Sequence, residues 1–447
     1  MRPALSTRLL LLGLVVSLPL FSFGCTTPSS TPASLLAGET VRILLVGDPF
    51  SLAVRALAPA LGERAGGNVQ IEVVSYDDLR ELTLRNAQDQ YSSYDIVSFD
   101  VLWVGEYGDQ AILLPLDSLI AATPELATDD FLPIAYAGSA YAGQQLGLPI
   151  QPHPELLWVH TGRLAEAGLT PPRTTTELIA VAAALTDPIN GQYGICWDGQ
   201  RGEPLGQQMA HFYAAFGQPL LTPEGRPSLN TPQGLAAARF TLDLLPFSPP
   251  DVLSMAWNLR PRRFIQGGCA MTYEWAARAY LAEEHPTTHG QVQYLPAPHA
   301  PDAAAVTPLG TWSLGIPANI GPRRELAWRF LAMLSSAATQ AELAEHGNGG
   351  MPRLSLLHDA NLATHYPAFT TVAQLSKAEQ LADWMRPAIP AWPGLEQILG
   401  TVFHDMLRGD LTPEAAVELA QQQAERLLED QPIALPDYTP SATPSRP

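Results

Sequence analysis

The sequence predicts an α/β protein built from two lobes. Its 447 residues are more than one hydrophobic core usually serves, because single cores stop growing at roughly 250–300 residues. Apolar runs typical of buried strands occur at 41–46 and 69–75, and apolar residues at helical spacing separate them at 51–64. Strands that alternate with helices through short connections indicate a parallel sheet with right-handed crossovers.

Cap and stop residues mark the ends of several helices. Gly66 follows the first helical run and is a typical helix stop. An acidic first turn opens a second helix at Tyr76. The threonines at 174–176 follow a Pro-fixed turn and open an N-capped helix, and Thr231 caps a further helix with Pro232 at its first position. We expect helices to begin or end at these residues.

Composition and motifs argue against several functions. The net charge of −19 and the isoelectric point near 4.8 argue against nucleic-acid binding, which needs a basic face for the phosphates. No CxxC, HExxH or clustered His and Cys spacing occurs, so we expect no metal and no other cofactor. A GxSxG elbow is absent, and Asp100 and Glu274 would act as a glycosidase pair only at a defined separation. We therefore expect that the protein is not an enzyme.

The N-terminus carries an export signal. Arg2 and Arg8 precede an apolar run at 9–20, which is long enough for a signal peptide and too short to span a bilayer. Cys25 follows, and a polar Ser/Thr/Pro spacer comes after it. The arrangement resembles a bacterial lipoprotein signal in which Cys25 is lipidated, although Ser22 stands where leucine is usual.

These signals predict an exported protein anchored by lipid on the outer face of the bacterial cytoplasmic membrane. We expect a signal peptide at 1–24 and the lipidated cysteine with a flexible linker at 25–39. A cleaved secretory peptide with an incidental cysteine is the alternative. Besides Cys25, only Cys196 and Cys269 are present; they permit one disulfide, and two buried thiols are equally compatible with the sequence.

The stretch at 94–117, YDIVSFDVLWVGEYGDQAILLPLD, joins a buried strand to a helix. Asp100 and Trp103 come directly after the apolar run at 96–99. In open α/β sheets, ligands bind at the carboxyl ends of the strands, so we expect both side chains near a binding site. Asp48 follows the first strand in the same way. A helix N-cap is the competing role for both aspartates.

The same stretch resembles the extracellular solute-binding proteins that deliver sugars to ABC importers. Their pattern is Y-D-(V/I)-apolar-apolar-x-D-x-x-W-x-x-E-(F/Y), followed by L-x-P-L-D. Segments at 264–275, 309–319 and 347–353 resemble further family motifs in the family's order. The matching residues of the first pattern are Tyr94, Asp95, Asp100, Trp103, Glu106, Tyr107, Leu114, Pro115, Leu116 and Asp117.

The resemblance implies a two-lobed periplasmic-binding-protein-like fold of the class II type. Each lobe would be a mostly parallel sheet flanked by helices, with a cleft between the lobes. We expect an N-terminal lobe at 40–148 and 306–350, a C-terminal lobe at 149–305 and 351–432, and a polar tail at 433–447.

The resemblance also implies a function. The protein would capture a sugar, oligosaccharide or polyol between its lobes, as a monomer, and deliver it to the permease subunits of an ABC importer. Within this class, a phosphorylated polyol is an alternative that requires a second basic residue in the cleft. A lipid-anchored sensor, which presents a small polar solute to a membrane receptor, is an alternative from another class.

Neutral sugars need two kinds of protein surface. Their hydroxyls pair with Asp, Glu, Asn, Gln and Arg, and their C–H faces pack on aromatic rings. Strand ends and glycine-rich loops supply such side chains in both predicted lobes, while Trp158, Trp257, Trp328, Trp384 and Trp392 are expected to be structural. The predicted ligand contacts are Asp48, Asp100, Trp103, Gln151, His153, Trp197, Glu274, Trp275, Gly310, Trp312 and Arg353.

Overall fold

The computed structural model describes residues 35–429. The predicted signal peptide, the predicted lipidation site Cys25 and the predicted polar tail lie outside these residues. In the part of the chain that the structure describes, no helix is long and apolar enough to cross a membrane.

Within residues 35–429, nine strands form one mixed sheet in the order β2-β1-β3-β10-β6-β8-β7, with β11 beside β10 and β9 beside β6. A separate pair of short strands, β4 and β5, lies outside it. The strands are β1 (Thr40–Val46), β2 (Asn68–Val74), β3 (Ile96–Asp100), β4 (Ala140–Tyr141), β5 (Gln144–Gln145), β6 (Leu148–His160), β7 (Tyr193–Cys196), β8 (Cys269–Trp275), β9 (Val292–Leu295), β10 (Thr307–Gly315) and β11 (Leu381–Ala382).

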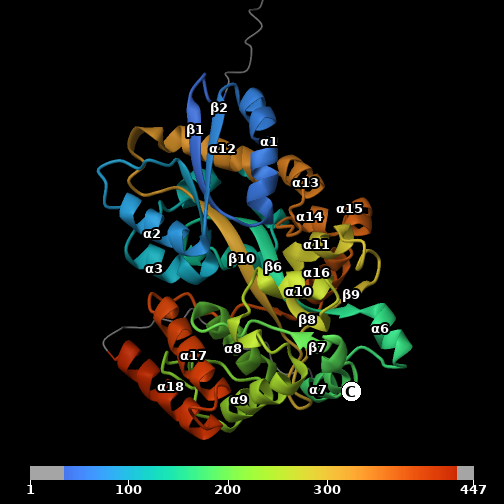
Figure 1. The fold of residues 1–447 in the computed structure, drawn as a ribbon. Coiled ribbons are helices and arrows are strands. Elements are labelled where there is room, and N and C mark those ends of the chain that lie inside the picture. Colours follow the sequence, from blue (N-terminus) through green and yellow to red (C-terminus); the bar gives the residue numbers. More distant parts are fainter. Residues whose placement is uncertain (1–34, 430–447) are drawn as a thin grey trace, which may run out of the picture. The chain divides into compact units, whose positions relative to one another are not determined.

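Helices cover both ends of this sheet. Among them, α1 and α12 pack on strands β1 and β2, and α8 packs on α17 at the other end (Figure 1). The helices are α1 (Pro49–Ala65), α2 (Tyr76–Asn86), α3 (Val104–Asp109), α4 (Asp117–Ala121), α5 (Pro133–Ala137), α6 (Thr161–Glu166), α7 (Thr175–Ala184), α8 (Glu203–Ala215), α9 (Pro232–Leu244), α10 (Leu259–Ile265), α11 (Ala279–Glu284), α12 (Arg324–Leu334), α13 (Ala337–Glu345), α14 (Leu354–Leu357), α15 (Ala360–His365), α16 (Ala368–Lys377), α17 (Trp392–Leu407) and α18 (Pro413–Leu428).

Two long strands, β6 and β10, connect the two ends of the sheet. The first half of β6 pairs antiparallel with β10, and its second half pairs antiparallel with β8 and β9. The last residues of β10 pair antiparallel with β3. The ladders β1–β2, β1–β3 and β7–β8 are parallel. The α/β class is confirmed, and the sheet as a whole is mixed because the two connecting strands run against their neighbours.

The predicted helix ends are confirmed at the residues that were expected to set them. Helix α1 ends at Gly66, whose φ of 70° is left-handed and therefore suits glycine. The side chain of Thr174 accepts from the Glu177 N–H in a complete capping box at the start of α7. Thr231 caps α9 in a similar way, since its side chain accepts from the Gly234 N–H.

The two remaining cysteines form a disulfide. Cys196 ends β7 and Cys269 begins β8, and these strands are parallel neighbours. Their Cα atoms lie 5.9 Å apart, and the bond joins positions 73 residues apart. A disulfide typically stabilises a fold by about 2–4 kcal/mol. The structure therefore decides between the two alternatives that the sequence left open.

Candidate functional site

A cavity of about 150 Å³ lies where the carboxyl ends of β1, β2, β3 and β8 approach the middle of β6 and β10. The first three strands are parallel, so their carboxyl ends meet at one edge of the sheet. This is the place where α/β sheets usually bind ligands. Its polar lining comes chiefly from Asp48, Asp100, Gln151, His153 and Arg278, and its aromatic lining from Tyr76, Trp257, Trp275 and Trp312.

Asp48 directs its carboxylate into the cavity and away from the adjacent helix. It occupies the N-cap position of α1, yet its side chain makes no capping hydrogen bond. Its Oδ2 lies 3.4 Å from Arg278 Nη2. In the amide orientation that gives both Gln151 side-chain atoms a hydrogen-bond partner, the nitrogen donates to Asp48 Oδ1 at 3.3 Å. Burial raises the pKa of Asp48, while Arg278 and Trp312 oppose that shift.

Asp100 has both of the roles that the sequence allowed for it. Its Oδ1 accepts from the Leu102 N–H at 3.3 Å, which caps the short 3-10 turn Val101–Trp103. Its Oδ2 accepts from the Tyr76 hydroxyl at 3.3 Å and faces the cavity. Burial raises the pKa of Asp100 to about 6, although the charge of Arg386 lowers it. The carboxylate is therefore mostly ionised at neutral pH and accepts hydrogen bonds.

His153 provides a second kind of acceptor. Burial lowers the pKa of His153 to about 3, so its ring is neutral at physiological pH. Its Nδ1 lies 2.8 Å from the Gln151 carbonyl oxygen. Because a carbonyl only accepts, Nδ1 carries the proton and Nε2 is left as an acceptor. A Cβ at Gly310 would lie 2.4 Å from this Nε2 and 3.2 Å from Arg386 Nη1, so this position requires a glycine.

The aromatic walls of the cavity come from both ends of the sheet. Strand register places Trp312 of β10 opposite Asp100 of β3 and Gln151 of β6. Trp275 ends β8, and its ring lies edge-on to His153 with centroids 4.9 Å apart. The cavity therefore combines apolar ring faces with hydrogen-bonding groups of both donor and acceptor type. Such a lining suits a neutral molecule with many hydroxyls.

Behind the cavity, Arg260 lies among three carboxylates and is fully buried. Its Nη1 is 2.8 Å from Glu155 Oε1 and 3.1 Å from Asp198 Oδ2. Its Nε and Nη2 donate to the Glu274 carboxylate at 3.1 and 3.2 Å. Burial raises the pKa of Asp198 to about 8, although Arg260 opposes that shift. Asp198 is therefore mostly protonated at neutral pH, which reduces the negative charge around the guanidinium.

His211 joins this cluster to the wall of the cavity. Burial lowers the pKa of His211 below its usual range, so its ring is neutral. Its Nδ1 donates to Glu155, and its Nε2 accepts from Arg386 at 2.9 Å. The Arg386 guanidinium lies 5.1 Å from the centroid of Trp275. The buried cluster thus contacts the Trp275 ring through Arg386.

The structure does not bring Glu274, Trp197 and Arg353 to this cavity, contrary to the expectation. Glu274 is fully buried and pairs with Arg260. Trp197 is also fully buried, and its indole N–H donates to Ser248 Oγ at 2.8 Å. Arg353 donates to the Ser335 carbonyl at 3.1 and 2.6 Å. All three therefore have structural partners that the sequence does not reveal.

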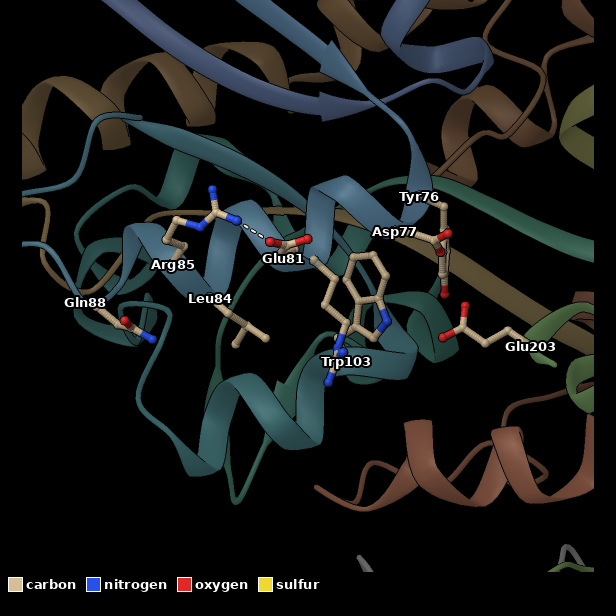
Figure 2. Close-up of a pocket in the computed structure, with 9 residues that line it drawn as sticks. Tyr76, Asp77, Glu81, Leu84, Arg85, Gln88, Trp103 and Glu203 are labelled. Atoms are coloured by element: carbon tan, nitrogen blue, oxygen red, sulfur yellow. Dashed lines mark hydrogen bonds and ion pairs between the residues drawn. The ribbon is translucent and has the colours of Figure 1, made fainter.

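Trp103 lies beside the cavity and lines a second, outer cavity of about 580 Å³. Figure 2 shows its indole near Tyr76, with Glu203 facing both rings. Arg85 pairs with Glu81 in the same region. The outer cavity is more charged than the inner one.

Several residues that line the inner cavity were not predicted, among them Tyr76, Arg278 and Trp257. Tyr76 and Arg278 both follow strands, so the rule that identified Asp48 and Asp100 would also have found them. Trp257 was expected to be structural, but it lines the cavity from the loop before α10. No local sequence signal distinguishes it from the buried tryptophans.

Comparisons with known proteins identify the family of this chain. Residues 50–341 match the family described as bacterial extracellular solute-binding protein. Over 427 residues, the chain is 24% identical to the mannitol-binding protein of Pseudomonas aeruginosa, and the match covers 90% of this chain and 96% of that relative.

Solved structures with the same fold contain polyols. The solute-binding protein of an ABC transporter from Agrobacterium radiobacter K84, in complex with ribitol, has a TM-score of 0.82 and 28% identity over 88% of this chain and 99% of that chain. A solute-binding protein from Agrobacterium vitis S4 with bound D-mannitol has a TM-score of 0.77 and 24% identity with the same coverage. The second likeness concerns the fold alone.

Proposed function

The chain belongs to the family of bacterial extracellular solute-binding proteins, and from this premise we propose that it captures one neutral polyol or monosaccharide for an ABC importer. The ligand occupies the inner cavity, and the loaded protein docks on the permease subunits in the membrane. A lipid on Cys25 keeps the protein at the outer face of that membrane. A relative named mannitol-binding protein and a solved relative in complex with ribitol support the ligand class.

The lining of the inner cavity is the observation that carries the proposal. Asp48, Asp100 and His153 Nε2 accept hydrogen bonds from ligand hydroxyls. Arg278 donates hydrogen bonds to the hydroxyl oxygens. The rings of Trp275 and Trp312 offer apolar faces to the C–H groups of a carbon chain or ring. A polyol has both kinds of surface along its whole length.

The size of the inner cavity favours a single small molecule. Its volume is about 150 Å³, and an apolar cavity of about this volume holds one benzene molecule. A five- or six-carbon polyol or monosaccharide has a volume similar to that of the cavity, whereas an oligosaccharide is much larger. Of the three ligand classes expected from the sequence, the polyol and the single sugar therefore fit best.

The charges favour a neutral ligand over a phosphorylated one. Arg278, the arginine in the lining, is paired with Asp48 at 3.4 Å. Asp100 adds negative charge to the same lining, since it is mostly ionised at neutral pH. A phosphate would face this carboxylate at short range, which is unfavourable in a buried site.

Closure about the connecting strands would complete the binding step. Strands β6 and β10 link the two ends of the sheet, and the predicted lobes at 40–148 with 306–350 and at 149–305 with 351–432 would rotate about them. Hinge closure around a ligand is general among periplasmic binding proteins. The ligand stabilises the closed form through contacts with both lobes.

A thermal-shift screen of the full chain in mild detergent tests the proposal. Mannitol, ribitol, glucose, maltose and amino acids would be compared. A ligand at a hundred times its dissociation constant stabilises a protein by about 2.7 kcal/mol, which raises Tm by several degrees. We expect that shift with a polyol or monosaccharide. A shift with amino acids alone would contradict the ligand class.

A further inference from the structure

One side chain, Tyr76, separates the inner cavity from the outer cavity. Among the described residues that line either cavity, Tyr76 is the one that lines both. The inner cavity has a volume of about 150 Å³ and the outer cavity about 580 Å³. Removing the phenol ring would therefore join a small compartment to a larger one.

We propose that Tyr76 determines the length of the ligand that this protein accepts, by closing the inner cavity against the outer one. The inference rests on the proposed function, because it concerns the same ligand site. With Tyr76 in place, the site holds one sugar or polyol unit. Without it, a second neutral unit extends into the outer cavity.

The position of the Tyr76 ring is held by aromatic contacts from both ends of the sheet. Its centroid lies 4.8 Å from that of Trp103 and 5.8 Å from that of Trp312. Trp257, which precedes α10 at the other end of the sheet, lies 5.0 Å away. The hydroxyl donates to Asp100 Oδ2 at 3.3 Å. These contacts make the ring a wall of defined position.

The backbone under this wall is anchored as well. Tyr76 is the first residue of α2, and Ser75 is the N-cap. Ser75 Oγ accepts from the Asp78 N–H at 3.2 Å and donates to Asp78 Oδ2 at 2.7 Å. Such a cap holds the first turn of a helix in place. We therefore expect a ligand that passes the wall to displace the Tyr76 side chain, because the cap holds the first turn of α2.

The outer cavity suits a second neutral, hydroxylated unit. Its lining includes the Trp103 ring and the Glu203 carboxylate, which face each other beside Tyr76 (Figure 2). Glu203 offers a hydrogen-bond acceptor, and Trp103, which is 2% exposed, borders the cavity as an apolar wall. Arg80 donates to the Glu106 carboxylate at 2.8 and 2.6 Å, and Arg85 pairs with Glu81. Both arginines therefore already pair with carboxylates, which disfavours a phosphate in the outer cavity.

Titration calorimetry on the full chain tests the inference with three probes. Mannitol and ribitol represent one unit, and maltitol represents two. We expect the wild-type protein to bind one of the first two at least tenfold more tightly than maltitol. In Tyr76→Ala, we expect maltitol affinity relative to mannitol or ribitol to rise at least tenfold, because the second unit gains room.

Control variants separate the wall from other effects of the substitution. Tyr76→Phe keeps the ring, so it should keep the wild-type preference. Tyr91→Ala removes a tyrosine that is 59% exposed and lines neither cavity, so it should also keep that preference. If Tyr76→Ala does not fold, Tyr76→Leu shortens the wall while keeping an apolar side chain, and the same rise in relative maltitol affinity is expected.

The outcomes distinguish the wall from the ligand class. An unchanged preference in Tyr76→Ala, with polyol binding intact in the wild type, overturns the role of Tyr76 and leaves the proposed function standing. If no probe binds the wild type, the polyol half of the proposed function fails, while glucose in the thermal-shift screen tests its monosaccharide half. In that case a crystal structure of Tyr76→Ala decides the inference: one continuous cavity between Asp100 and Glu203 supports it, and two separate cavities overturn it.

Discussion

Arg260 and Arg278 lie on either side of β8 in the sequence, and both lie among carboxylates, but their surroundings differ. Arg260 is fully buried and contacts Glu155, Asp198 and Glu274. The Arg278 side chain is 12% exposed and pairs with Asp48 at 3.4 Å. The N–H groups of Arg260 therefore bond to the protein itself, whereas Arg278 lines a cavity.

The difference shows how this fold separates a structural charge cluster from a binding site. A buried ion needs nearby partners, because the loss of its hydration costs several kcal/mol. The Arg260 cluster meets that need within the protein and has little capacity left for a ligand. Around Arg278, the carboxylates of Asp48 and Asp100 and the imidazole of His153 keep acceptors directed at the cavity. Three substitutions test this comparison.

Arg260→Met should have the largest effect. It leaves Glu155 and Glu274 buried without their guanidinium partner, and breaking a buried ion pair from one side costs about 3–5 kcal/mol. We expect a loss of that size in the free energy of unfolding, measured by urea denaturation. Arg239→Met is the matched control, since Arg239 pairs with Glu414 on the surface, where such pairs contribute about 0–1 kcal/mol. Equal losses in the two variants would contradict the comparison.

Asp198→Asn should change how stability depends on pH. Burial raises the folded-state pKa of Asp198 to about 8 from its ordinary value of 3.8. The folded protein therefore keeps a proton that the unfolded chain releases, and stability falls as pH rises between these values. The slope from one proton is at most roughly 1.4 kcal/mol per pH unit.

Urea denaturation at pH 5, 6, 7 and 8 measures this slope. In Asp198→Asn we expect the decline in unfolding free energy over this range to be smaller than in the wild type, because asparagine has no proton to lose. The conservative amide keeps the size of the side chain. Parallel curves for the two proteins would show that Asp198 is ionised in the folded state and would contradict the description of the cluster.

Asp100→Asn should weaken ligand binding while changing stability little. Asparagine still caps the turn at Leu102, but the ligand loses a charged acceptor, and hydrogen bonds to charged groups contribute about 1.5–3 kcal/mol. We expect a roughly tenfold to hundredfold loss of affinity for the best polyol of the screen, measured by calorimetry. Tm of the ligand-free protein should stay within a few degrees.

Asp251→Asn provides the control for this variant. Asp251 pairs with Arg263, and both side chains are more than a third exposed, so its loss should leave ligand affinity unchanged. The pKa of Asp100, which burial raises to about 6, adds a second readout. Wild-type affinity should fall below pH 6 as the carboxylate is protonated, and the fall should be absent in Asp100→Asn. Identical pH profiles would exclude Asp100 as the titrating group.

Much of the fold, and part of the site, could be predicted from local sequence. The stop at Gly66, the N-cap among the threonines at 174–176 and the N-cap at Thr231 depend on a few neighbouring residues, so they were predicted correctly. Asp48 and Asp100 lie in the cavity because each stands at the carboxyl end of a parallel strand. Strand ends are a local signal, and the common edge of a parallel sheet brings them together.

The remaining assignments depended on partners that are distant in the sequence. Glu274 and Trp275 are neighbours on β8, and alternation along a strand points them to opposite faces. Trp275 lines the cavity and Glu274 pairs with Arg260. Sequence periodicity does not predict which of the two side chains points to the cavity. That choice depends on the buried Arg260, which contacts both Glu274 of β8 and Glu155 of β6, and these groups meet only in the folded chain. The disulfide likewise required β7 and β8 to be neighbours, and such long-range pairing is a property of the folded chain.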